Sequence, residues 1–260
     1  MIWFFWYYGR RYRRSGPMGP VEAIIFILIA FAYSSCNAKD YNNSRAQRTT
    51  PSPDVSAAQP YDMGSRRDAA PIRHVGEEYK FGRYKQVSDL VDEPIVWRIL
   101  EVKDKRLLIC SEMGLDRVLY NFTQPFDRKW ESSSIRKWLN NDFAKTAFYE
   151  YERERIVETV VENKGAKPTR DKIFLLSSDE FNKYFGGRSP SEPSRYSVQR
   201  GTKEAVSGRG KGNCWVWLRD SGVTPGCFAF VEPTGEVNLD GKKGYEDDGS
   251  VRPAMWVEME

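Results

Sequence analysis

Histidine is almost absent from this sequence, which contains one in 260 residues. That residue, His74, stands in a polar stretch ahead of the part that is rich in apolar residues. The region expected to fold therefore has no histidine, which excludes Ser-His and Cys-His nucleophile pairs there. Cysteines are also few, and Cys36, Cys110, Cys214 and Cys227 lack the spacing of metal ligands. We expect no metal and no cofactor.

Beyond the first 35 residues, the chain also lacks a marked excess of positive or negative charge. Of the formal net charge of +4, the first 35 residues carry +3, because four arginines there face the single acid Glu22. The rest of the chain is therefore nearly neutral. Such a chain offers no electrostatic footprint for a nucleic acid, so we expect no nucleic-acid partner.

The sequence also lacks an apolar run of about 20 residues, the length that a membrane-spanning helix needs. The run Val21–Ala32 is shorter, follows the arginines of 10–14 and precedes small residues, a layout typical of a secretory signal. Its end, Ala32-Tyr33-Ser34-Ser35-Cys36, resembles the lipobox of bacterial lipoproteins. The resemblance implies that residues 1–35 are a signal peptide and that Cys36 carries a lipid. The protein would then be anchored to a membrane of the bacterial cell envelope, in the periplasm or at the surface.

Other interpretations of this segment stay open, because Tyr33 stands where a lipobox usually has leucine and Glu22 interrupts the apolar run. In one, the signal is cleaved without lipidation and the protein is secreted. In another, the segment remains as an uncleaved membrane helix. The pair Arg10-Arg11 also suggests a twin-arginine signal, but Tyr12-Arg13-Arg14 does not continue that pattern.

The remaining chain divides at about residue 75. Residues 36–75 contain hardly any large apolar side chains and cannot offset the entropy of ordering, so they predict a flexible lipoprotein tether. From 76 to 260, aromatic and aliphatic residues recur at short intervals. We expect one globular domain there, because a chain of this length holds one or two domains and its first part cannot contribute a core.

Within the domain, alternation and turn residues predict short strands before and after a group of helices. The expected strands are 95–102, 106–110, 117–122, 171–176, 214–219, 226–231, 236–239 and 251–257. Helices are expected at 134–140 and 144–156, and a third begins at a capping box of Ser177 and Glu180 and ends at Gly186-Gly187. These elements predict an α+β fold with a mixed, mostly antiparallel sheet, two or three flanking helices and long loops. We expect the two ends of the domain to meet in one sheet.

A set of motifs in this region resembles an exported bacterial family, the domain of unknown function 6273, from about Tyr79 onward. The motifs are Trp97-Arg98-Ile99-Leu100, Trp130-Glu131, Arg136-Lys137-Trp138-Leu139-Asn140, Asp171-Lys172-Ile173-Phe174-Leu175-Leu176-Ser177, Trp217-Leu218-Arg219 and Val251-Arg252-Pro253-Ala254. That family resembles, more distantly, the C-type-lectin-like fold of formylglycine-generating enzymes. The resemblance implies flanking helices and a loop-rich ligand face, and it implies no activity.

Two groups of proteins with the C-type-lectin-like fold hold metal ions, and the sequence lacks the metal-binding motifs of both. Formylglycine-generating enzymes hold copper with closely spaced cysteines, whereas Cys214 and Cys227 lie on separate expected strands and pair only if those strands bring them together. Sugar-binding lectins hold calcium with Glu-Pro-Asn and Trp-Asn-Asp. Glu232-Pro233-Thr234 echoes the first motif without the second, and it predicts a hairpin turn that includes Gly235. Cys110, within an apolar stretch, predicts a buried side chain.

Several side chains could contact a ligand, each with a structural alternative. Trp215, Trp217 and Trp256 form either a sugar-stacking platform or part of the core; alternation places the first two on one side of a strand. The arginines at 219 and 252 lie in apolar strands and need partners, either a ligand or a structural carboxylate such as Asp171, Asp179 or Asp220.

The long loop 188–211 is basic, and the acidic turn 246–249 follows Tyr245. The loop contacts an acidic glycan or a protein, or is merely a loop, and the turn holds a cation or is merely solvated. The candidate binding residues are Arg188, Arg195, Tyr196, Arg200, Arg209, Trp217, Arg219, Asp220, Asp247, Asp248 and Arg252.

Together these observations favour a non-catalytic binding or interaction module that recognises a glycan or a protein through its loop-rich face. One alternative is a carboxylate-based envelope enzyme such as a glycoside hydrolase, which needs no histidine. The other is a purely structural envelope protein.

Overall fold

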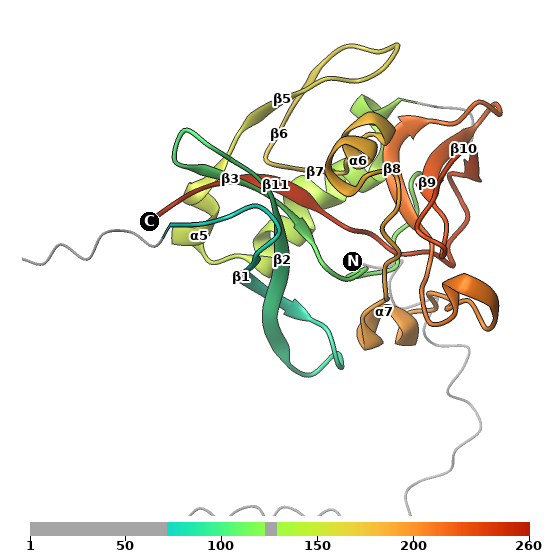
Figure 1. Cartoon of the computed structure of the whole chain (residues 1–260), viewed down its shortest axis with the longest axis horizontal. Helices are drawn as coiled ribbons and strands as arrows, with labels where there is room; N and C mark the ends of the chain where they lie inside the picture. The colour runs from blue at the N-terminus through green and yellow to red at the C-terminus, as the bar shows by residue number, and fades with distance from the viewer. Residues whose placement is uncertain (1–71, 123–128) are drawn as a thin grey trace, which may run out of the picture. The chain divides into compact units, whose positions relative to one another are not determined.

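The computed structural model describes residues 72–122 and 129–260 (Figure 1). The chain separates into two units, Met1–Gly64 and Ser65–Glu260, and the described residues all belong to the second. The predicted signal peptide, Cys36 and nearly all of the predicted tether lie outside the described residues. Among the described helices, none is long and apolar enough to cross a membrane.

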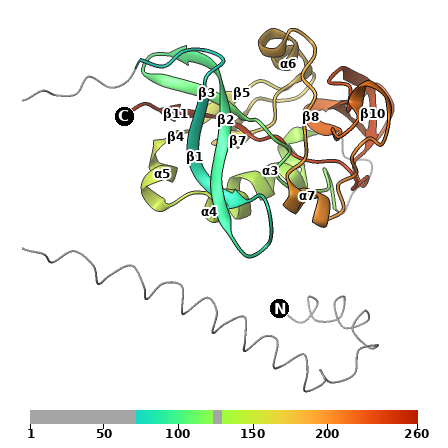
Figure 2. The ribbon, with the colours of Figure 1, turned by 60° about the horizontal axis from the view of Figure 1, so that its bottom comes forward.

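The main sheet joins the two ends of the domain, as predicted. Its strand pairs are all antiparallel, whereas the sequence predicted a mixed, mostly antiparallel sheet. Its strand order is β1-β2-β3-β11-β4, and β7 also pairs with β11 (Figure 2). The strands are β1 (Glu78–Lys85), β2 (Asp92–Lys103), β3 (Arg106–Ser111), β4 (Ile156–Val157), β7 (Ile173–Phe174) and β11 (Ala254–Glu258). Strand β11 lies beside β3, with Met255 opposite Ile109.

The core lies on both faces of this sheet. Ile95, Trp97 and Ile99 of β2 are fully buried on one face, and in β3 the successive residues Leu108 and Ile109 are both buried. Helices α3 (Ser134–Trp138), α4 (Ala144–Ala147) and α5 (Glu150–Arg155) lie on one side of the sheet, and α6 (Ser178–Phe185) lies on the other (Figure 2). The 3-10 turn η1 (Trp130–Ser132) precedes α3, and the π-turn η2 (Leu139–Phe143) joins α3 to α4.

Two predictions about local structure are wrong. The expected helix 144–156 is interrupted at Phe148, which is extended (φ −132°, ψ 136°) so that its ring packs against Phe81 at 5.2 Å in the core. Residues 117–122 form no strand, because the backbone of this segment bonds to separate partners. For example, Asn121 N donates to Gly244 O at 3.0 Å, and Tyr120 O accepts from Ile135 N at 3.1 Å.

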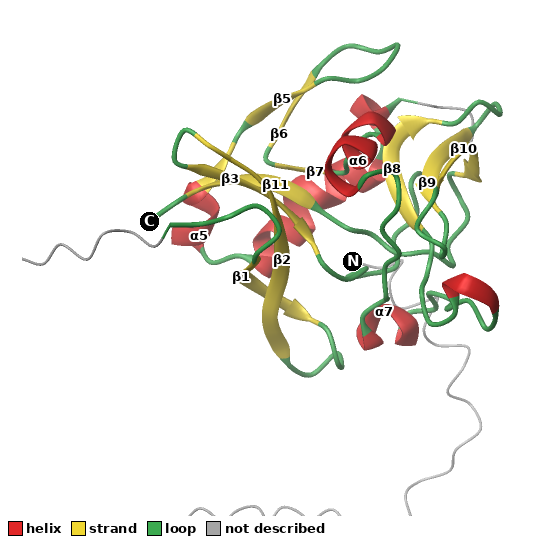
Figure 3. Cartoon of the chain, in the orientation of Figure 1, coloured by secondary structure: helices red, strands yellow, loops and turns green. Residues whose placement is uncertain are grey.

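The capping box that begins α6 is confirmed: Ser177 Oγ accepts from Glu180 N, and the Glu180 carboxylate accepts from Ser177 N at 2.8 Å. The helix ends at Gly186 in the left-handed conformation (φ 63°). The small hairpin of β5 (Thr159–Val161) and β6 (Thr169–Asp171) was not predicted from the sequence (Figure 3).

A second sheet has the order β10-β9-β8, made of β8 (Val216–Ser221), β9 (Cys227–Val231) and β10 (Val237–Lys243). The predicted turn before β10 is confirmed, since Gly235 N donates to Glu232 O at 2.8 Å. The β8–β9 register places Cys214 beyond one end of the hairpin and Cys227 at the other, so the two do not pair. Both are buried free thiols, as is Cys110.

The long loop 188–211 contains the short helix α7 (Arg195–Gln199) and the 3-10 turn η3 (Gly208–Gly210). Backbone bonds fix it to the rest of the domain, among them Ser194 N to Gly114 O at 2.8 Å and Ser189 N to Gly235 O at 3.0 Å. The loop thus connects the second sheet to the segment that follows β3.

Candidate functional site

The described tryptophans fall into two groups, according to whether the indole N–H donates a hydrogen bond within the domain. Four of them donate this hydrogen to an acceptor within the domain: Trp97, Trp130, Trp215 and Trp217. In the described part of the chain Trp138 and Trp256 donate to no acceptor, and each lines a pocket. Both side chains are partly exposed, so each indole N–H is open to solvent and could donate to a ligand, and the two pockets are candidate ligand sites.

The predicted platform of three tryptophans does not form. Trp215 and Trp217 are 6 % and 2 % exposed, and their rings pack against each other edge to face at 4.5 Å. Their interpretation as core residues is therefore confirmed. Trp256 alone of the three is partly exposed, on the main sheet rather than on β8.

The pocket beside Trp138 has a volume of about 240 Å³, and we name it the loop-face pocket. It lies where the segment after β3, helix α3, the end of α7 and the acidic turn meet. Its lining residues are Arg117, Val118, Leu119, Phe122, Trp138, Arg200 and Asp247. Arg200 and Asp247 were predicted as binding residues, and the structure brings them to one pocket.

Arg117 ties the elements of the loop-face pocket together. Its guanidinium donates to the carboxylate and the backbone carbonyl of Asp247, and to Arg200 O at 2.8 Å. Arg117 was not among the predicted binding residues, because it lies in a segment that was predicted as an ordinary strand. The mostly apolar composition of that segment gave no signal that its backbone is irregular.

Arg200 enters the pocket from the end of α7, where its Nε donates to the Asp116 carboxylate at 3.0 Å. Asp116 is buried and also accepts from Tyr84 Oη at 2.7 Å and from Arg117 N at 2.7 Å. Burial raises the pKa of Asp116 above its ordinary value, although Arg200 and Tyr84 act in the opposite direction. The predicted residue Tyr196 lies below the Arg200 guanidinium, 5.8 Å from ring centre to Cζ.

The walls of the loop-face pocket combine aromatic rings with charge-balanced polar groups. Phe122 is 60 % exposed, and Trp138 packs on Phe143 at 5.2 Å. Arg117 pairs with Asp247, and Arg200 pairs with Asp116. The pocket therefore offers apolar faces, fixed planar donors and one carboxylate acceptor, and each arginine that lines it is paired with an aspartate.

The other predicted residues of the loop and the acidic turn lie outside this pocket. Asp248 accepts from the Trp215 indole at 3.0 Å and pairs with Lys203 at 3.2 Å. Arg188 donates to Thr234 O at 3.1 Å. Arg195 and Arg209 are exposed.

The remaining predicted residues are buried and hold elements together, so they do not line the loop-face pocket. Arg219 pairs with Glu180 at 3.0 Å rather than with any of the predicted aspartates. Asp220 accepts from Ser178 N at 2.7 Å, which joins β8 to α6.

Arg252 is 5 % exposed and donates to Ser111 O at 2.8 Å. Trp217 is buried in the core, as described above. Nowhere in the described ranges do three or more His, Cys, Asp or Glu side chains gather in a way that could hold a metal ion.

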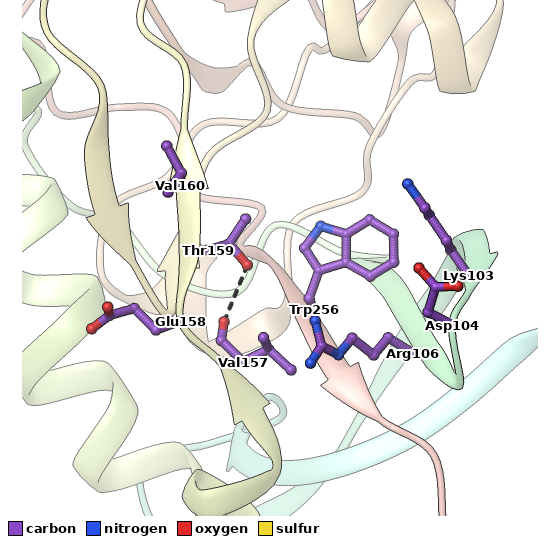
Figure 4. Close-up of a pocket in the computed structure, with 8 residues that line it drawn as sticks. All are labelled: Lys103, Asp104, Arg106, Val157, Glu158, Thr159, Val160 and Trp256. Atoms are coloured by element: carbon purple, nitrogen blue, oxygen red, sulfur yellow. Dashed lines mark hydrogen bonds between the residues drawn. The ribbon is translucent and has the colours of Figure 1, made fainter.

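A second pocket, of about 310 Å³, surrounds Trp256 on the main sheet, and we name it the Trp256 pocket (Figure 4). Its lining residues are Lys103, Asp104, Arg106, Val157, Glu158, Thr159, Val160 and Trp256. They come from the β2–β3 turn and the strand ends beside it, from β11, and from β4, β5 and the residue between them (Figure 4).

Residues 104–259 match the family described as Domain of unknown function (DUF6273), and the chain belongs to this family. The matched part begins in the β2–β3 turn, later than the Tyr79 expected from the motifs, and contains every residue that lines the loop-face pocket. No curated protein matches the chain, and no solved structure matches it either.

Proposed function

We propose that this protein is a non-catalytic module that recognises a glycan through the loop-face pocket. The observation that carries the proposal is the chemistry of the pocket walls: Phe122 and Trp138 stand beside two arginines, each of which is paired with an aspartate. A sugar ring has apolar C–H faces that suit an aromatic ring and hydroxyl groups that suit fixed donors and acceptors. Charge balance favours a neutral sugar over a strongly acidic one.

A role in binding rather than catalysis is supported by the number of carboxylates. Glycoside hydrolysis uses a pair of carboxyl groups on the two sides of the scissile bond. Of the residues that line the loop-face pocket, Asp247 alone carries a carboxyl group, and it is bonded to Arg117. A protein ligand and a purely structural role remain the alternatives to a glycan.

We also propose that the fold is distantly C-type-lectin-like, and that the protein is exported and lipid-anchored at Cys36 in a bacterial envelope. The loop-rich side of a mixed α+β domain supports the first proposal. The arginines, apolar run and terminal cysteine of residues 10–36 support the second. If it holds, the variant Cys36→Ala leaves the membrane fraction and loses fatty-acid labelling, whereas Ser34→Ala stays attached. Continued attachment of Cys36→Ala contradicts lipidation at this residue.

The binding proposal is tested by measuring the affinity of the full chain for a panel of neutral tetrasaccharides built of glucose, galactose, mannose or N-acetylglucosamine. Phe122→Ser removes an exposed ring of the pocket, and we expect at least a tenfold weaker affinity, about 1.4 kcal/mol. Tyr151→Ser is the matched control, since Tyr151 is equally exposed (62 % against 60 %) and lies outside the pocket. If no saccharide binds, or if both variants bind like the wild type, the proposal fails.

A further inference from the structure

The Trp256 pocket has the features of a ligand site and is separate from the loop-face pocket. On β11, Met255 and Val257 are fully buried in the core, so the alternation of the strand places Trp256 on the opposite face of the sheet. There it stands opposite Leu108 of β3 and Val157 of β4. The indole is partly exposed, and its N–H has no acceptor within the described parts of the domain.

The walls of the pocket supply polar groups around this ring. The side chains of Lys103 and Asp104 form neither a hydrogen bond nor an ion pair with any described residue, and both face the pocket beside Trp256 (Figure 4). Asp104 and Lys105 adopt the left-handed conformation (φ 49° and 60°), which makes the β2–β3 turn tight. On the opposite wall, Thr159 Oγ1 donates to Val157 O at 3.2 Å, which leaves its lone pairs available (Figure 4).

The charges that line the pocket balance. Lys103 and Arg106 are cationic, and Asp104 and Glu158 are anionic. Arg106 has a further counter-ion in Glu258 at 3.8 Å, and Glu158 pairs with Arg170 at 3.4 Å. The pocket therefore has no net attraction for an anion or a cation, whereas an aromatic floor with donors and acceptors at its rim suits a neutral, hydroxyl-rich ring.

We infer that the Trp256 pocket is a second saccharide-binding site, on the main sheet and separate from the loop-face pocket. One face of a neutral pyranose ring stacks on the Trp256 indole. Lys103 donates to the sugar hydroxyls, and Asp104 and Thr159 accept from them. The inference rests on the proposed function for its ligand class only, because the residues of the two pockets do not overlap.

The test is the stoichiometry of saccharide binding to the full chain, measured by calorimetry with the same neutral tetrasaccharides. We expect two saccharides per chain for the wild type, and one each for Trp256→Ala and for Phe122→Ser. In Lys103→Gln the affinity of the second site falls at least fivefold. Lys105→Gln is the matched control: it removes the same charge from the same turn at a residue that does not line the pocket.

Because Trp256→Ala could lose stability, Trp256→Phe provides a second measurement, and the indole N–H resonance of Trp256 provides a third. We expect that resonance to shift on addition of the saccharide in the wild type and in Phe122→Ser. One site that Phe122→Ser removes and Trp256→Ala leaves intact overturns this inference alone. One site that Trp256→Ala removes and Phe122→Ser leaves intact overturns the proposed function and supports this inference.

Discussion

Asp116 and Arg200 form an ion pair at 3.0 Å in which solvent reaches the arginine but hardly the aspartate, with side-chain exposures of 47 % and 4 %. The pair connects the segment after β3 to the end of α7. It thereby places a guanidinium at the rim of the loop-face pocket and gives the buried carboxylate its cationic partner.

Removing Arg200 should therefore lower stability as well as change the pocket. In Arg200→Gln the buried Asp116 loses its cation, and we expect a loss of about 1–3 kcal/mol in the free energy of unfolding. The double variant Asp116→Asn, Arg200→Gln should lose less than the sum of the two single variants, because both break one pair. Additive losses in urea titrations would show that the pair does not couple the two elements.

The stability contributed by Asp116 should depend on pH with a defined sign. Its pKa in the folded state is raised above the ordinary value, chiefly by burial, so the folded protein binds the proton more tightly than the unfolded chain. That contribution is fully present below the ordinary aspartate pKa of about 3.9 and is lost as the pH rises through the folded-state pKa. Relative to Asp116→Asn, the wild type should thus lose stability as the pH rises in this window. The opposite slope in urea titrations would show that Arg200 and Tyr84 outweigh burial.

Gly82 should tolerate no side chain. It has φ 66° at a bulge in β1, and a Cβ there would meet the Phe148 ring and lie 2.6 Å from Ala147 O. Gly165 has a similar φ of 71° with nothing within 4 Å, so Gly165→Ala incurs the backbone strain alone, about 1–2 kcal/mol. We expect Gly82→Ala to lose roughly 1–3 kcal/mol more, from overpacking. Equal melting temperatures for the two variants would contradict the close packing of α4 on β1.

The cysteines of the described domain should stay reduced and unreactive while it is folded. Cys110, Cys214 and Cys227 are buried free thiols, and burial raises the pKa of the Cys214 thiol to about 12. Since the thiolate is the reactive form, native alkylation followed by peptide mass spectrometry should leave all three unmodified, and unfolding should expose all three. A Cys214–Cys227 peptide pair joined by a disulfide would contradict the β8–β9 register.

The sequence predicted those elements whose signals are local. An apolar run that ends at a turn identified the strand at 95–102, and the spacing of Ser177 and Glu180 identified the start of α6, because each pattern reflects contacts a few residues apart. The segment 117–122 is similarly rich in apolar residues, yet its backbone bonds to distant residues such as Gly244. Whether such a segment forms a strand depends on backbone partners far away in the chain, and a local sequence pattern contains no information about them.

The loop-face pocket was predictable in part for the same reason. Arg200 and Asp247 stood out as polar residues in loops, whereas Phe122 and Trp138 looked like ordinary members of a strand and a helix. Which tryptophans keep a free indole N–H depends on where acceptors such as Asp171 and Asp248 lie after folding. That information exists only in the tertiary structure.

The central position of β11 has a consequence for how the chain assembles. Residues 254–258 pair with β3 on one side and with β4 and β7 on the other, so the main sheet cannot close until this segment has been synthesised. Until then the edges of β3, β4 and β7 stay unpaired and open to aggregation.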